Sequence, residues 1–194
     1  SLNQMGKEVV VVEVQPRLMP KQLDEKASRI LLNVVQSFGV SVHTGTRIKE
    51  ITGESFATGF RTDDDPEASC DMVIHSTGIR PNIELVKGTG IRTNRGILVN
   101  GKMETNLAGI YAAGDIAEFE NRVAGLWNYA SLQGEVAGSN MAGAERNYQA
   151  PAAVTILNAF RTSLFSIGQV EEGSYDAAIT DFDCESNRYR KICN

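Results

Sequence analysis

Residues 8–43 combine a β-branched run, an amphipathic segment and a second short apolar run, and this order constrains the fold most strongly. Residues 9–12 are four consecutive valines, typical of a strand buried on both faces of a parallel sheet. From Asp24 to Gly39, apolar residues recur at i, i+3 and i+4 spacing, so one stripe of the predicted helix packs on a sheet. Residues 40–43 predict the next strand. The unit is therefore a strand–helix–strand crossover, which is almost always right-handed.

The two ends of this predicted helix carry favourable capping residues. Asp24 is a good N-cap, and Glu25 suits the positive end of the helix dipole. Gly39 is typical of the position just after a helix. Pro16 and Pro20 mark the preceding segment as a loop. The sequence therefore predicts a helix from Asp24 that Gly39 ends.

The rest of the chain predicts short strands and one more helix. Residues 47–51 and 54–61 are half-polar segments on either side of Gly53 and predict an antiparallel hairpin. A strand at 70–76 is expected to be buried, and a helix is expected at 127–142. The remaining predicted strands are 110–113, 164–167, 177–180 and 189–192. The inward positions predicted for the helix are Ala130, Leu132, Val136, Ala137 and Met141.

The composition excludes several classes of protein. Hydrophobic residues make up 42% and charged residues 22% of the 194 residues, which is ordinary for a globular protein. A net charge of −5 argues against nucleic-acid binding, which needs a basic face. No apolar run approaches the ~18 residues of a membrane span, and no signal peptide is visible.

Cysteines and carboxylates predict no metal site. Cys70, Cys184 and Cys193 are odd in number and form no close pair, which fits a reduced, cytoplasmic location. Residues 63–66 are three aspartates followed by a proline. Consecutive carboxylates cannot all converge on one ion, so a solvated turn is the favoured interpretation. We expect His43 and His75 to be packing residues rather than ligands or bases.

Gly114 and Asp115 form the most informative pair of residues for function. The predicted strand 110–113 runs directly into them. Glycine allows a tight turn close to a ligand, and open α/β sheets bind ligands at the carboxyl ends of their strands. A carboxylate there accepts hydrogen bonds from sugar or polyol hydroxyls. The alternative is an ordinary Gly-Asp turn.

A series of short motifs in a fixed order resembles the pyridine nucleotide-disulfide oxidoreductase superfamily. The resemblance is strongest to the branch of rubredoxin reductases, NADH oxidases and nitrite reductase flavoproteins, and it spans nearly the whole chain. Each motif is weak alone, but their order and spacing are specific. The matching segments are residues 6–13, 16–20, 23–24, 39–40, 77–82, 110–115, 133–138, 140–143 and 165–168.

The resemblance implies that FAD and NADH are the cofactors. It places Gly114 and Asp115 at the ribityl chain of the flavin, and Gly78 in a cofactor-binding turn. It also aims the helix beginning near Trp127 at the flavin pyrimidine edge, where the helix dipole would stabilise negative charge on reduced flavin. The alternative for Trp127 is a plain core aromatic. The resemblance assigns no catalytic side chain in this chain.

Glu13 is the expected contact for NADH. A carboxylate at the end of this strand can accept bonds from both adenosine-ribose hydroxyls and repels the 2′-phosphate of NADPH. The alternative is a solvated residue at a strand end. Arg17 is either a neighbour of the nucleotide or a surface cation.

Both glycine-rich G-x-G-x-x-G fingerprints of the family are absent from this sequence. We therefore expect an α/β chain with a partial doubly wound FAD/NAD(P)-binding fold that lacks both fingerprints, plus a partial C-terminal α+β interface domain. The expected domains are a partial NADH-binding domain at 1–78, an FAD-domain remnant at 79–149, and the start of the interface domain at 150–194.

These observations predict a fragment of an FAD-dependent NADH-oxidising reductase. Hydride would pass from NADH to flavin, and electrons would then pass to an acceptor such as rubredoxin, oxygen or a nitrite-reducing centre. The alternative is a non-catalytic binding or assembly module. Because both pyrophosphate cradles are missing, we expect the chain alone to be inactive. We also expect it to form a homo-oligomer or to need a complementary segment.

Overall fold

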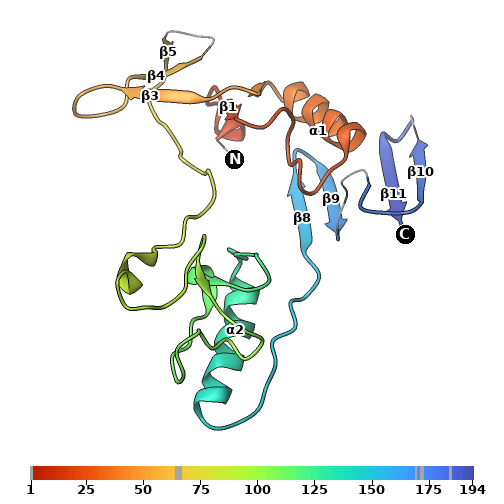
Figure 1. Cartoon of the computed structure of the whole chain (residues 1–194). Helices are drawn as coiled ribbons and strands as arrows, with labels where there is room; N and C mark the ends of the chain where they lie inside the picture. Colours follow the sequence, from red (N-terminus) through yellow and green to blue (C-terminus); the bar gives the residue numbers. More distant parts are fainter. Residues whose placement is uncertain (1, 64–66, 169, 171–172, 184) are drawn as a thin grey trace. The chain divides into compact units, whose positions relative to one another are not determined.

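The computed structural model describes residues 2–63, 67–168, 170, 173–183 and 185–194 (Figure 1). The chain divides into two compact units. The first, called here the split unit, combines Ser1–Ile74 with Ala152–Asn194, and the second, the continuous unit, is His75–Pro151. Each unit is described by itself.

The split unit contains the predicted strand–helix–strand element. Strand β1 (Val10–Glu13) pairs in parallel with β2 (Ser41–Thr44), and helix α1 (Glu25–Ser37) connects them. The Asp24 carboxylate accepts a hydrogen bond from the Ala27 N–H at 2.8 Å and caps the helix. Gly39 follows the helix with a left-handed φ of 80°. The predicted helix and both its ends are confirmed.

Four antiparallel pairings complete the split unit. The hairpin predicted after residue 46 forms from β3 (Ile48–Thr52) and β4 (Gly59–Thr62). Strand β4 starts five residues later than the predicted segment 54–61. Its other edge pairs with β5 (Ala68–Ser69). Two further hairpins lie after residue 152. The remaining elements are a 3-10 helix η1 (Asn3–Met5), β5 (Ala68–Ser69), β8 (Val154–Ala159), β9 (Thr162–Ile167), β10 (Ala178–Asp183) and β11 (Arg188–Cys193).

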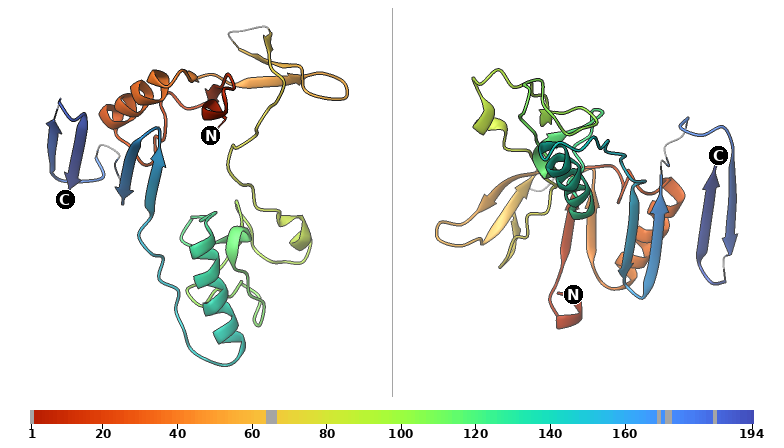
Figure 2. Two further views of the ribbon diagram at one scale, coloured as in Figure 1. Left: turned by 180° about the vertical axis from the view of Figure 1, so that it is seen from behind. Right: turned by 90° about the horizontal axis from the view of Figure 1, so that it is seen from below.

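The hairpin β8–β9 packs against α1 and closes the core of the split unit (Figure 2). The buried core consists of Leu23, Leu31, Val35 and Val40, with Leu157, Phe160 and Leu164 packed against it. The Ser166 hydroxyl donates to the Gln22 carbonyl at 2.6 Å. Segments more than 140 residues apart in sequence thus share one core.

The continuous unit is built around helix α2 (Trp127–Met141). A short parallel pair, β6 (Ile97–Leu98) and β7 (Ala117–Glu118), accompanies the 3-10 helices η2 (Ile83–Val86) and η3 (Gly114–Ile116). Most of the remaining chain is loop. The main buried cluster consists of Met103, Tyr129, Val136, Ala137 and Tyr148.

Three strand predictions are wrong in part or in full. Residues 9–12 are not buried on both faces, since Val10 is 43% exposed and β1 pairs with β2 alone among the described strands. Residues 70–76, all of which the structure describes, form no strand, and residues 110–113 contribute only one isolated bridge at Tyr111. Strand β1 has a neighbour on one edge only, and residues 70–76 pair with no described strand. Residues 110–113 have isolated backbone hydrogen bonds to residues 103–105 instead of a continuous ladder.

The predicted inward face of α2 is confirmed in part. Val136 and Ala137 are buried, but Leu132 and Met141 are 41% and 68% exposed. The other buried helix positions are Tyr129, Gln133 and Asn140. The two buried amides bond to backbone groups outside the helix, which is why polar side chains occupy the inner face.

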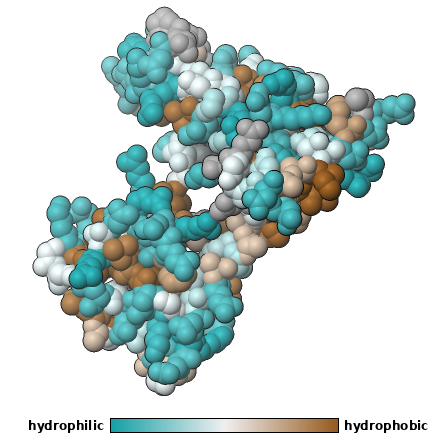
Figure 3. All heavy atoms as spheres, turned by 45° about the vertical axis from the view of Figure 1, so that its right-hand side comes forward, coloured by the Kyte–Doolittle hydropathy of each residue, from teal (hydrophilic) through white to brown (hydrophobic). Residues whose placement is uncertain are grey.

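Both units leave large apolar side chains exposed (Figure 3). The chain exposes 13744 Å², whereas two separate compact units of these lengths would expose about 11,000 Å² together. The excess of roughly 3,000 Å² is the size of an obligate protein interface. The most exposed of these side chains are Met5, Phe56, Leu85, Trp127, Ile179 and Ile192.

Candidate functional site

Glu13 lies at the carboxyl end of β1, in register with Thr44 of β2. Its side chain is half-buried, and its Oε1 accepts a hydrogen bond from the Gln15 N–H at 2.8 Å. The loops after both strands are tied together, because the Gly45 N–H donates to the Gln15 carbonyl at 2.8 Å. The strand end is therefore ordered, and one oxygen of the Glu13 carboxylate remains available to a ligand hydroxyl.

A hollow of about 200 Å³ lies between α1 and the loop that follows β1. Thr44 lines it, so it opens beside the strand end that carries Glu13. Arg17 also lines it; the guanidinium donates to the Pro20 carbonyl at 3.2 Å, and its buried Nε has no partner among the described residues. Its remaining lining residues are Pro16, Leu18, Glu25, Ser28, Arg29 and Leu32.

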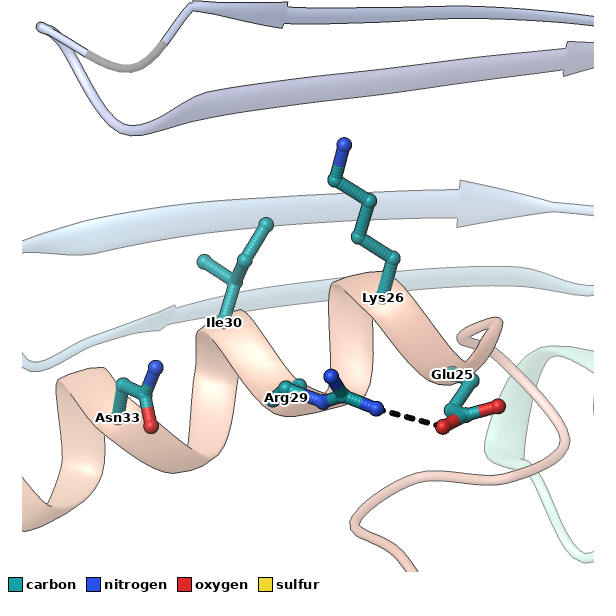
Figure 4. A pocket seen from close by; sticks show the side chains of 5 residues that line it. All are labelled: Glu25, Lys26, Arg29, Ile30 and Asn33. Carbon is teal, nitrogen blue, oxygen red and sulfur yellow. Dashed lines mark hydrogen bonds and ion pairs between the residues drawn. The ribbon is translucent and has the colours of Figure 1, made fainter.

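A second hollow of about 440 Å³ lies over the outer side of α1 (Figure 4). The Arg29 guanidinium and the Glu25 carboxylate form an ion pair of 2.6 Å across one helical turn. Lys26 and Ile30 project from the helix in a common direction. Both members of the ion pair are largely exposed, so the pair stabilises the helix by only about 0.3–0.5 kcal/mol. None of the predicted site residues lines this hollow.

Asp115 lies in the middle of η3 in the continuous unit. Its carboxylate is exposed, and no group in the described part of the chain hydrogen-bonds to it. It follows Gly114, whose φ is 80°. The expected placement at the end of a regular strand is wrong, because residues 110–113 form no strand. The left-handed φ of Gly114 gives the tight turn that the sequence predicted, and the Asp115 side chain that follows it is exposed.

The start of α2 is open. The N-cap residue is Leu126, and no side chain caps this end among the residues described. Trp127 is 87% exposed, so its interpretation as a core aromatic is wrong in this structure. Uncapped N–H groups at a helix start favour a negatively charged partner. This end of α2 can therefore face the electron-rich edge of a ligand.

Gly78 lies in an exposed segment without regular structure and has a left-handed φ of 87°. The side chain of its neighbour, Ile79, lies 3.0 Å from the position that a Cβ on Gly125 would occupy. Ile79 therefore contacts the loop that leads into α2. The structure thus brings the predicted turn at 77–82 to the segment just before Trp127.

Sequence reasoning missed two buried polar residues beside Asp115. Glu118 is 1% exposed and accepts hydrogen bonds from the Gly96 N–H and the Asn94 side chain, both at 2.9 Å. Burial alone would raise the pKa of this carboxyl, but these hydrogen bonds outweigh it and lower the pKa. Gln133, 2% exposed, accepts from the Gly114 N–H at 2.8 Å.

Gln133 also lies near Tyr148, a buried residue of the same core. Burial raises the pKa of the Tyr148 phenol, and the Gln133 amide partly offsets this shift. The Tyr148 hydroxyl nevertheless has no partner of hydrogen-bond geometry within the described chain. The hydrogen bond of the Gln133 oxygen is the one from the Gly114 N–H.

Other residues singled out from the sequence do not form a reaction centre. His43 and His75 are exposed rather than packed, and the His75 ring contacts the Thr77 hydroxyl at 2.7 Å. Within the described ranges, no three His, Cys, Asp or Glu side chains gather as metal ligands. Residues 64–66 and Cys184 lie outside the described residues, so the acidic turn is described only at Asp63, which pairs with Lys49. No described helix has the length and apolarity needed to cross a membrane.

The mixed α/β fold of this chain matches part of solved oxidoreductase structures. A family model for pyridine nucleotide-disulphide oxidoreductase matches residues 1–134. The chain belongs to this family, as the motif order predicted.

Similar proteins are longer than this chain. Nitrite reductase [NAD(P)H] of Bacillus subtilis is 34% identical over 189 residues, which are 97% of this chain and 24% of that protein. NADH-rubredoxin oxidoreductase of Clostridium acetobutylicum is 35% identical over 153 residues, covering 79% of this chain and 37% of that protein. The chain thus spans about a quarter to two fifths of these relatives.

Solved structures show the same partial coverage. The crystal structure of an FAD-dependent pyridine nucleotide-disulphide oxidoreductase from Desulfovibrio vulgaris matches with a TM-score of 0.81 at 27% identity, over 92% of this chain and 48% of that one. The structure of NADH:rubredoxin oxidoreductase from Clostridium acetobutylicum matches with a TM-score of 0.70 at 29% identity, over 92% and 44%.

Proposed function

We propose that this chain is part of an FAD-dependent, NADH-oxidising reductase. The observation that carries the proposal is the exposed Asp115 carboxylate, held on a left-handed glycine turn that is bonded to α2. An exposed carboxylate on an ordered turn suits the polyol hydroxyls of a flavin. Family membership supports the same cofactor.

Each predicted site residue has a role in this proposal. Asp115 accepts hydrogen bonds from the ribityl hydroxyls, and the open N-terminus of α2 at Trp127 stabilises negative charge at the pyrimidine edge. Gly78, which has a left-handed φ, is assigned to cofactor contact in this proposal. Glu13 accepts bonds from the adenosine ribose of NADH beside the smaller hollow. Bound flavin would supply the hydride-accepting chemistry.

We infer that the electron acceptor is a redox protein or a small molecule. The named relatives include a nitrite reductase and a rubredoxin oxidoreductase, and the described residues do not favour either acceptor. A cytoplasmic location remains our expectation. The domain boundaries at 78 and 149 also remain proposals.

We further propose that the chain acts with a complementary segment or a second copy. One edge of β1 is unpaired among the described strands, and the chain exposes far more surface than compact units of its size. These two observations also favour the second candidate, a non-catalytic assembly module. Flavin binding separates the two candidates.

The direct test is an ultraviolet-visible spectrum, an NADH-oxidation assay and a solution mass for the purified chain. We expect no bound flavin, no NADH oxidation and a dimer, because the pyrophosphate cradles are missing from the sequence. NMR titration with FAD should nevertheless shift the Gly114 and Asp115 amides at about millimolar ligand. A chain unaffected by FAD would favour the assembly module, and a flavin-loaded active monomer would contradict the half-site proposal.

The NADH half of the proposal is tested at Glu13. The intact carboxylate should favour NADH over NADPH by about 30- to 100-fold, since it accepts ribose hydroxyls and repels a 2′-phosphate. Glu13→Ala should shrink this preference, mainly by weakening NADH. Parallel NMR titrations with the two nucleotides measure it. Equal affinities for the intact chain would overturn the assignment of Glu13.

A further inference from the structure

Gln133 is a buried amide in a helix, and its partner is a backbone group outside that helix. Its side chain is 2% exposed, and its Oε1 accepts the Gly114 N–H at 2.8 Å. Nineteen positions separate the two residues in sequence. A buried amide is costly unless it is hydrogen-bonded, so the bond to Gly114 accounts for a polar residue on the inner face of α2.

The Gly114 turn is joined to α2 by the hydrogen bond from the Gly114 N–H to Gln133. Ala130 lies on the same side of α2, because its Cβ would be 3.6 Å from a Cβ placed on Gly114. Gly114 has a left-handed φ of 80°, and this conformation needs support from its surroundings. Asp115 is the next residue along the chain, so the hydrogen bond to Gln133 also restricts where the backbone of Asp115 points.

We propose that Gln133 is a positioning residue that fixes the Gly114–Asp115 turn against α2 and thereby orients the Asp115 carboxylate toward its ligand. The inference rests on the proposed function of Asp115 as a flavin contact. The hydrogen bond that the Gln133 oxygen accepts comes from the turn, so this acceptor oxygen is the atom that matters.

A purely structural role for Gln133 predicts a different pattern, and α2 offers a matched control. Asn140 is also a buried amide of α2, but it bonds to the carbonyls of Lys102, Val136 and Arg146 and not to the turn. Asn140→Leu should destabilise the unit without releasing Gly114. Gln133→Leu should do both, because leucine has a similar size but no acceptor.

The first measurement is amide hydrogen exchange at Gly114 in the full chain labelled with ¹⁵N-glycine. Gln133→Leu should speed exchange at Gly114 about tenfold, whereas Asn140→Leu should not do so beyond its general effect on the other glycines. Gln133→Glu keeps an acceptor at the same reach and should restore slow exchange. Unchanged exchange in Gln133→Leu would overturn the proposal.

The second measurement tests whether Gln133 affects FAD binding through Asp115. In an NMR titration with FAD, Gln133→Leu should weaken binding about tenfold when Asp115 is present and have no further effect in the Asp115→Ala background. Equal weakening in both backgrounds would show a merely structural role and overturn the proposal. A third outcome is that FAD causes no shifts in the unaltered chain while Gln133→Leu still speeds exchange at Gly114. In that case the assignment of Asp115 to flavin is wrong, and the positioning of the turn by Gln133 is still supported.

Discussion

The N-termini of α1 and α2 differ in how their polar groups are satisfied. At α1, the Asp24 carboxylate accepts from the Ala27 N–H, from the Tyr189 hydroxyl at 2.6 Å and from the Lys191 ammonium at 3.2 Å. At α2, the N-cap is Leu126, and no described side chain caps the first turn. The first end is complete within the chain, and the second is open to a ligand. For locating a ligand site, the uncapped start of α2 is therefore more informative than the well-capped start of α1.

The largest expected effect is the loss of stability when the cap at the N-terminus of α1 is removed. Asp24→Ala removes the cap of α1 and leaves Tyr189 and Lys191 without their shared acceptor, so we expect a loss of about 3 kcal/mol in the free energy of unfolding. Urea denaturation of the full chain measures it. Asp115→Ala is the matched control and should change stability by less than about 0.5 kcal/mol. Equal losses would abolish the contrast between the two ends.

The control variant Asp115→Ala has its own expected effect, on the affinity for FAD. Asp115→Ala should weaken FAD about 10- to 100-fold, the value of one charged hydrogen bond. NMR titration with FAD measures this loss as a shallower rise of the amide shifts at matched ligand concentrations. A dissociation constant that does not change would make Asp115 a simple turn residue.

The pH dependence of stability should report the closed end. Burial would raise the pKa of Asp24, but the bonds from Tyr189, Ala27 and Lys191 lower it. Its contribution is therefore complete above the unfolded pKa and is lost as pH falls below about 4. At the alkaline side, burial and Asp24 raise the pKa of Tyr189 to about 12, so stability falls as pH rises from about 10.

Asp24→Asn removes the charge at a similar size and should flatten both limbs of this profile, with a smaller loss at neutral pH than Asp24→Ala. Thermal unfolding across the pH range measures it. If the Asp24→Asn variant and the unaltered chain have parallel profiles, the carboxylate charge does not link α1 to β11.

The smallest expected effect comes from adding a cap at the N-terminus of α2. Leu126→Asp supplies a cap to α2 and should stabilise the chain by about 1 kcal/mol. The added carboxylate should also weaken FAD, because it occupies the free N–H groups and repels negative charge. Leu126→Ala removes the same apolar side chain without adding a cap and is the control. Tighter flavin binding in Leu126→Asp would contradict the proposed role of this helix end.

Local sequence signals predicted the closed end but not its partners. An aspartate before an amphipathic stretch identifies a cap because capping involves neighbouring residues. Tyr189 and Lys191 lie 165 or more positions away from Asp24, and no pattern of spacing connects them. The family resemblance predicts that Asp115 contacts flavin, and this stays a prediction; the apolar run before Asp115 predicted a strand that does not form.

Tertiary context explains these failures. Strand propensity at 70–76 and 110–113 does not produce a strand, because neither segment has a neighbour that pairs with it along its length. Gln133 did carry a weak signal, because it shares helical spacing with Tyr129, Val136 and Ala137 on the inner face of α2. A polar residue within such a stripe predicts a buried partner, although it does not say which one.

The order of segments in the two units affects how the chain folds during synthesis. The continuous unit, 75–151, is one stretch of chain, so its core needs no later segment of this sequence. The split unit must wait, because the core around α1 includes β8 and β9. Until residue 167 has emerged, one side of α1 stays exposed, and closing the intervening loop slows the final step. A nascent chain therefore presents α1 as a target for chaperones well before β8 and β9 can cover it.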